Sequence, residues 1–153
     1  MPTRRDLIIA LTSMAATLAV VALASARTSV LSSTVFDWTA MTAKPTKVGA
    51  VRQVVQAPTA TLDELEIHIT TSNAGQTSHA PHKHPDEEVL IVKEGTVESL
   101  VNGQLRRIGP GSVIFQAADE LHGIRNVGDV PATYHVIKWN SPGMLKQRAK
   151  ETP

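Results

Sequence analysis

The chain has 153 residues, of which 42% are hydrophobic, and this suits one buried core better than two. It contains no cysteine, which excludes disulfides, iron–sulfur clusters and thiolate zinc sites and leaves histidine and carboxylate as the strong metal ligands. A net charge of +1 and an aromatic content of 3% give no basic, aromatic-bearing stripe of the kind that binds nucleic acid.

Residues 1–26 have the pattern of an export signal. Arg4 and Arg5 precede an apolar stretch, and small residues suit cleavage after Ala26 or, as second choice, after Ala24. The opening TRRDLII resembles the twin-arginine signal, which exports folded proteins. The alternative is an uncleaved anchor, because an apolar stretch of about 20 residues can span a bilayer. We expect cleavage, and therefore an exported periplasmic or secreted protein without a membrane span.

The chain after this segment alternates between apolar and polar residues. Residues 27–47 are rich in serine, threonine and alanine and are predicted to form an arm or linker. Leu65, Ile67 and Ile69 then alternate with polar residues, which is the period of a half-buried strand. Other strand-like stretches cover residues 48–55, 88–92, 96–101, 104–108, 112–115, 122–126 and 132–139.

Turn residues separate these stretches at short intervals. Asn102 and Gly103 are the clearest example, because Asn-Gly between two strands predicts a type I′ hairpin. Short strands at this spacing predict an antiparallel sandwich or barrel, which we expect over residues 48–139. The tail, residues 140–153, is expected to form at most a fraying helical turn.

The sequence HKHPDEE, which leads into one predicted strand, concentrates metal-binding side chains. His82 and His84 are two apart, so an extended chain directs both to one face, and Glu88 has the same parity after a bend at Pro85. Glu88 would then point into the barrel, where a metal ion would neutralise its buried charge. His122, at the start of a later strand, is the candidate for a fourth ligand. The alternative interpretation is a solvated cluster of loop residues.

These residues resemble the two motifs of the cupin family of small β-barrels. The first motif contains a glycine, His-x-His, a glutamate and a glycine, and the second contains a glycine, a histidine and an asparagine. In this chain they fall at Gly75, His82, His84, Glu88, Gly95, Gly111, His122 and Asn126. Ala117 and Asp119 replace the family's proline and glycine, which affects loop shape rather than the ligands. The resemblance implies an all-β fold, the antiparallel double-stranded β-helix or jelly roll of the cupin barrel.

The expected cofactor is one divalent metal ion bound by His82, His84, Glu88 and His122. Mn or Fe is our first choice, and Ni, Cu, Co and Zn also suit three imidazoles and one carboxylate. As an enzyme, the protein would use an open-coordinated ion for oxygenase, isomerase or lyase chemistry on a small molecule. Glu88 would then serve as the base, with His68 as a weaker candidate that also suits a hydrogen-bonded wall residue.

The alternative function is a binding module that captures a small anion or sugar acid without turnover, because the fold alone does not choose between the two. We also expect a homodimer. In that dimer residues 48–55 would pair with the neighbour's sheet, since small barrels protect strand edges in this way.

Overall fold

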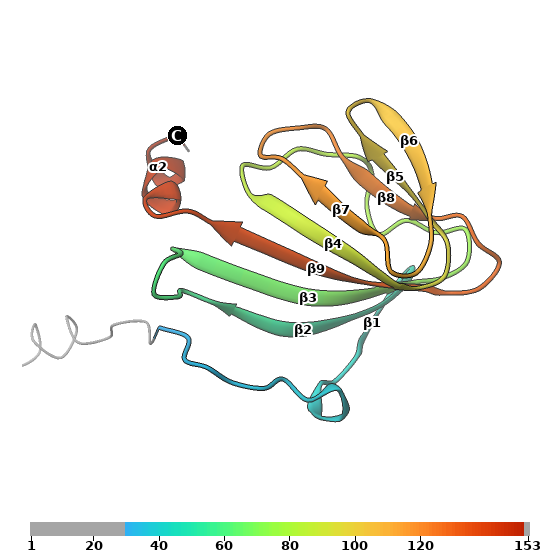
Figure 1. Cartoon of the computed structure of the whole chain (residues 1–153), viewed down its shortest axis with the longest axis horizontal. Helices are drawn as coiled ribbons and strands as arrows, with labels where there is room; N and C mark the ends of the chain where they lie inside the picture. Colours follow the sequence, from blue (N-terminus) through green and yellow to red (C-terminus); the bar gives the residue numbers. More distant parts are fainter. Residues whose placement is uncertain (1–29, 152–153) are drawn as a thin grey trace, which may run out of the picture.

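The computed structural model describes residues 30–151, so the predicted export segment lies outside the described residues. The described chain is mainly antiparallel β-structure (Figure 1). Its elements in chain order are η1 (Trp38–Ala40), β1 (Lys44–Thr46), β2 (Gly49–Ala57), β3 (Glu64–Ser72), β4 (Glu87–Glu94), β5 (Val97–Val101), β6 (Gln104–Ile108), β7 (Val113–Gln116), β8 (Gly123–Asn126), β9 (Ala132–Asn140) and α2 (Met144–Glu151). Among these residues no helix is long and apolar enough to cross a membrane.

The strands form two antiparallel sheets. The larger sheet has the strand order β1-β2-β3-β9-β4-β7, and the smaller one has the order β6-β5-β8. The core lies between the two sheets, because buried residues from both form one cluster. The larger sheet contributes Leu90, Tyr134 and Val136, among others, and the smaller sheet contributes Val97 and Ile124. This arrangement confirms the predicted antiparallel jelly-roll barrel.

Alternation along β4 and β7 separates the inside of the barrel from the outside. Leu90 and Val92 of β4 are buried at 2% and 1% exposure, whereas Ile91 between them is 37% exposed. Successive side chains of a strand point to opposite faces of the sheet, so whether a residue number is odd or even decides which face its side chain joins. It therefore also decides which polar side chains point inward.

The predicted type I′ hairpin joins β5 and β6. Asn102 and Gly103 both have positive φ angles, of 50° and 71°, as this turn requires. Val101 pairs with Gln104 directly beside the turn. The hairpin prediction is confirmed.

Both ends of the described chain add structure to the predicted barrel. β1 lies within the stretch expected to be an arm, and its three residues pair with Gly49–Val51 of β2. At the other end, the stretch expected to form a helical turn contains the eight-residue helix α2. Part of the outer edge of β2 is therefore occupied by the chain itself.

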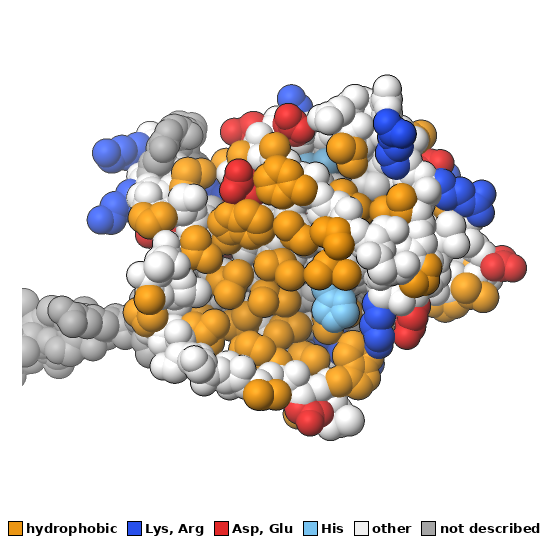
Figure 2. Space-filling model, viewed as in Figure 1, with side chains coloured by type: hydrophobic (Ala, Val, Ile, Leu, Met, Phe, Trp, Pro, Cys, Tyr) orange, Lys and Arg blue, Asp and Glu red, His pale blue; other side chains and the backbone are white. Residues whose placement is uncertain are grey.

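The outer surface of the larger sheet is apolar (Figure 2). One row of cross-strand partners contains Val55, Ile67, Ile137, Val89 and Phe115. Adjacent rows add further apolar side chains. We call these side chains together the outer apolar face; they are Val55, Leu65, Ile67, Val89, Ile91, Val113, Phe115, Ile137 and Trp139. Among these, Val113 is 65% and Phe115 is 53% exposed.

Candidate metal centre

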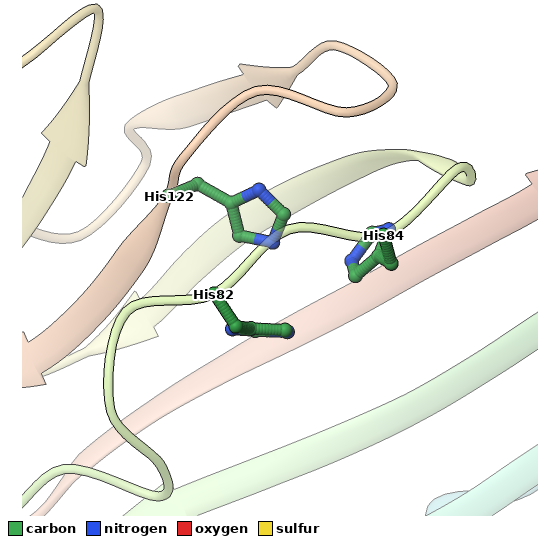
Figure 3. Close-up of side chains that lie close together, drawn as sticks. All are labelled: His82, His84 and His122. Carbon is green, nitrogen blue, oxygen red and sulfur yellow. The ribbon is translucent and has the colours of Figure 1, made fainter.

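Three histidines from two separate loops meet at one end of the barrel cavity (Figure 3). His82 and His84 precede β4, and His122 directly precedes β8. Their ligand nitrogens all lie within 4.8 Å of one another. The ring of His122 has its centroid 4.7 Å from that of His82 and 4.6 Å from that of His84. This is the spacing of groups that can share one ion.

A pair of backbone hydrogen bonds brings the two loops together. The amide of His82 donates to the carbonyl of His122, and the amide of His122 donates to the carbonyl of His82, both at 3.0 Å. The two residues thus form an isolated antiparallel bridge outside the named strands. The bridge positions histidines that are far apart in sequence.

Hydrogen bonds to backbone carbonyls fix the orientation of two of the rings. Nδ1 of His84 donates to the carbonyl of Asp86 at 3.0 Å, and Nδ1 of His122 donates to the carbonyl of Glu120 at 2.8 Å. These bonds place the ring proton on Nδ1 and leave Nε2 with its lone pair, which is the state that binds metals. Nε2 of His122 is buried and has no hydrogen-bond partner within residues 30–151. The side chains therefore fit a divalent ion.

Burial also keeps the three imidazoles neutral. Desolvation lowers the pKa of His82, His84 and His122, and neighbouring imidazoles lower each of them further. Neutral imidazole is the form that coordinates a metal. The site is thus in a binding-competent state at neutral pH.

Glu88 of β4 faces the three histidines. Its carboxyl oxygens lie 3.6 Å from Nε2 of His84 and 3.9 Å from Nε2 of His122. The residue is 7% exposed. Burial raises its pKa to about 7, although Lys138 acts in the opposite direction. Glu88 thus points into the barrel beside the histidines, and its predicted role as a metal ligand stays a prediction.

A row of polar side chains crosses the inner face of the larger sheet beside the histidines. Glu66 of β3 is the cross-strand partner of Lys138 of β9, which in turn partners Glu88, and Glu88 partners Gln116 of β7. Oε1 of Gln116 is buried, and the described part of the chain offers it no hydrogen-bond partner. Lys138 and Gln116 thus add a cation and an amide to the cavity wall, beside the residues predicted from the sequence.

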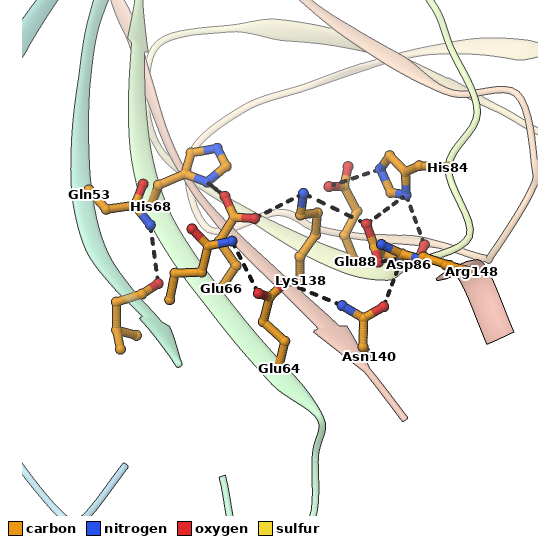
Figure 4. A network of polar contacts seen from close by, with 12 residues as sticks. Gln53, Glu64, Glu66, His68, His84, Asp86, Glu88, Lys138, Asn140 and Arg148 are labelled. Atoms are coloured by element: carbon orange, nitrogen blue, oxygen red, sulfur yellow. Dashed lines mark hydrogen bonds and ion pairs between the residues drawn. The ribbon is translucent and has the colours of Figure 1, made fainter. Parts of the chain in front are cut away.

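His68 belongs to a polar network along this wall (Figure 4). Its Nδ1 lies 3.1 Å from Glu66, whose other oxygen lies 3.0 Å from Nζ of Lys138. Burial lowers the pKa of His68 despite the neighbouring carboxylate. Burial alone would raise the pKa of Glu66, but Lys138 and His68 reverse this and leave it lowered. His68 thus lines the cavity as a hydrogen-bonded wall residue, and its catalytic role stays a prediction.

The cavity between these residues has a volume of about 200 Å³. This is below the roughly 300–1,000 Å³ of pockets for drug-sized ligands. Leu90, Ile124, Tyr134 and Val136 form an apolar wall beyond the polar end. The space suits a small molecule with one polar end directed at the histidines.

Comparison with known proteins shows which family this barrel resembles. Residues 68–138 match the Cupin_2 family model, described as a cupin domain. The polyketide cyclase RemF from Streptomyces resistomycificus is a similar solved structure, with 20% identity, coverage of 73% of this chain and 82% of that chain, and a TM-score of 0.58. KdgF from Halomonas sp. is similar at 16% identity, with coverage of 74% of this chain and 99% of that chain and a TM-score of 0.57. An RmlC-like cupin from Shewanella frigidimarina is similar at 14% identity, with coverage of 72% of this chain and 94% of that chain and a TM-score of 0.58. These comparisons support the cupin superfamily. At these identities the likeness of the structures shows the fold alone, and no curated protein matches the chain.

Within the barrel, the predicted residues divide into two groups. His82, His84 and His122 form the close cluster with Glu88 beside it, whereas His68 lies on the wall and bonds to Glu66. Lys138 and Gln116 also line the cavity and were not singled out from the sequence. A parity signal was present for Lys138, because it is two residues from the inward-facing Val136, just as His84 is two from His82.

Proposed function

We propose that this cupin binds one divalent metal ion through His82, His84, His122 and Glu88 and brings a small molecule to it in the barrel. The observation that supports this most strongly is the buried Nε2 of His122. It lies without a hydrogen-bond partner in the described chain, beside two more neutral imidazoles. A lone pair buried in this way is unfavourable unless it meets a proton donor or a cation.

The chain's own residues have distinct parts in this function. Backbone carbonyls hold His84 and His122 with Nε2 turned to the centre. Glu88 supplies a negative charge to balance the cation, and the apolar wall limits access of water. When bound, a metal ion supplies Lewis acidity and open positions for a ligand oxygen.

We favour an enzyme of oxygenase, isomerase or lyase type over a pure binding module. Glu88 supports this choice, because burial raises its pKa to about 7 in the metal-free site, so that a Glu88 carboxyl that leaves the metal could take and return a proton near neutral pH. The alternative, non-catalytic capture of a small anion or sugar acid, is favoured by the cation Lys138 in the cavity wall. Oxygen-uptake and substrate screens of the metal-loaded protein distinguish turnover from capture.

Metal content tests the site itself. We expect one ion per chain in the wild type and loss of most of it in His84→Ala and His122→Ala, measured by native mass spectrometry and elemental analysis. His135→Ala is the matched control, because His135 pairs with Ile91 on the outside of the sheet. Full occupancy of the double variant His84→Ala/His122→Ala would reject the site.

We further propose that the protein is exported by a twin-arginine route and receives Mn or Fe before export. Nitrogen and oxygen ligands bind Cu and Zn more tightly than Mn or Fe when all are available, so affinity alone does not select the weaker metals. If the chain folds in the cytoplasm, the barrel would bind whichever of these ions is available in that compartment. Exchanging residues 1–26 for the signal of an unfolded-chain exporter should change the metal found in the exported protein. Identical Mn or Fe content by both routes would contradict this.

A second copy of the chain is the partner that we propose for the outer apolar face. Strands of nine residues are about 30 Å long, and five strands are about 20 Å wide, which gives roughly 600 Å² of flat surface. A stable interface buries about 800 Å² per partner, so this face and its rim are of suitable size. Pairing through the edge at residues 48–55 is less favoured, because β1 already covers Gly49–Val51.

A further inference from the structure

Asp86 connects the candidate metal centre to the C-terminal helix. It lies between two of the proposed ligands in sequence, and it is 6% exposed. Its backbone carbonyl accepts the hydrogen bond that orients His84, and its side-chain Oδ2 lies 3.7 Å from Nδ1 of the same ring. Any displacement of Asp86 therefore changes the direction of Nε2 of His84.

Two cations hold the carboxylate of Asp86 (Figure 4). Nζ of Lys138 lies 3.7 Å from its Oδ2, and Nη2 of Arg148 donates to its Oδ1. Lys138 is shared, because it also pairs with Glu66 at 3.0 Å. Without Arg148, the ammonium of Lys138 would serve two carboxylates, the buried one of Asp86 and the half-buried one of Glu66.

Arg148 reaches this position from helix α2, outside the barrel. The same Nη2 also donates to Oδ1 of Asn140 at 2.7 Å, and Asn140 is 3% exposed at the end of β9. The guanidinium is thus bound to a fixed point of the larger sheet as well as to Asp86. This double attachment sets where the carboxylate lies.

We propose that Arg148 is a positioning residue for the metal centre: it fixes Asp86, and Asp86 fixes the ring of His84. The proposal rests on the proposed function, because it concerns a ligand of that site. If Arg148 is removed, Asp86 must take Lys138 or Nδ1 of His84 as its main partner. Either change disturbs the bond from His84 to the Asp86 carbonyl. Loss of such supporting partners typically lowers metal affinity about 10- to 100-fold.

The test compares Arg148→Gln and Arg148→Lys with Lys150→Gln, which removes the same charge from an exposed position of the same helix. Each full-length protein is stripped of metal and titrated with Co²⁺, and the affinity and the dissociation rate are measured. We expect Arg148→Gln to bind Co²⁺ about 10- to 100-fold more weakly, Arg148→Lys to recover part of the loss, and Lys150→Gln to match the wild type. Wild-type affinity in Arg148→Gln would overturn the proposal, even if its helix melted earlier.

A second measurement does not depend on metal binding. In the metal-free protein, the ¹⁵N signals of the His84 ring report its tautomer and its hydrogen bond. They should change in Arg148→Gln and stay constant in Lys150→Gln, and an unchanged His84 signal in Arg148→Gln would overturn the proposal. A wild type that binds no Co²⁺ would instead reject the proposed function, while the ring signals still decide whether Arg148 positions His84.

Discussion

Glu88 should make the stability of the metal-free protein fall as the pH rises. Burial raises the pKa of its carboxyl from 4.5 to about 7 in the folded state. The folded chain therefore binds the proton more tightly than the unfolded chain does. Its stabilising contribution is fully present below the unfolded pKa and is lost as the pH rises through about 7. A shift of this size corresponds to roughly 3 kcal/mol.

Glu88→Gln isolates this effect, because a neutral amide keeps the shape and removes the titration. The histidines at the site have lowered pKa values, and so they act in the opposite sense in both proteins. We expect the gain in unfolding free energy of the variant over the wild type to be larger at pH 8 than at pH 5, as measured by urea denaturation of metal-free protein. If the difference in unfolding free energy between Glu88→Gln and the wild type does not change with pH, the raised pKa of Glu88 is contradicted.

The spacing of residues in the sequence was sufficient to predict which site residues share a face when they are close in the chain. His82, His84 and Glu88 could be assigned to one face because a fixed spacing and one bend connect them. The face of Lys138 could have been assigned from its spacing to Val136, but its place beside Glu88 depends on the β4–β9 register. The place of Arg148 depends on the docking of α2 and has no such local signal. The bond between His68 and Glu66 was accessible in principle, because residues two apart on a strand share a face.

Asn126 ties the end of β8 to the neighbouring loops. It has 0% exposure, and its amide nitrogen lies within hydrogen-bond distance of the carbonyls of Ser72, Asn73 and Val130 at 2.8–3.1 Å. Its Oδ1 accepts from the amide of Gly128 at 2.9 Å. Each buried group left without a partner costs about 1–3 kcal/mol.

Asn126→Ala should therefore lower the free energy of unfolding by about 3 kcal/mol or more. Asn102→Gly is the control, because the exposed turn already has a positive φ at that position. Its unfolding free energy should stay within about 0.5 kcal/mol of the wild type. Urea denaturation of the metal-free proteins measures both, and similar stability of the two variants would refute this role of Asn126.

At the level of elements, prediction succeeded where a local signal was strong. The Asn102-Gly103 turn and the alternating strands required no knowledge of distant residues. β1 was missed because Lys44–Thr46 is short, polar and contains a proline, so its strand conformation comes from pairing with β2. α2 has few apolar residues, and its length was underestimated because contacts such as that of Arg148 with Asp86 lie outside any local pattern.

At the level of the whole molecule, the outer apolar face predicts the oligomeric state. Phe115→Lys places a charge on this face, at a side chain that is 53% exposed, and should convert a dimer to a monomer. Leu105→Lys is the matched control, because Leu105 is 63% exposed on β6 of the smaller sheet. Light scattering over a range of concentrations measures both masses. A dimeric Phe115→Lys protein, or a monomeric wild type, would contradict the interface.

The bridge between His82 and His122 has a consequence for the order of events in folding. The chain between these residues forms β4 to β7, so the three histidines meet only when this long segment closes, which we expect late in folding. An unfolded or partly folded chain then offers an ion at most the close pair His82 and His84. Interactions that are absent from the transition state slow unfolding and leave the folding rate almost unchanged. Bound metal should therefore lengthen the lifetime of the native barrel without accelerating its formation.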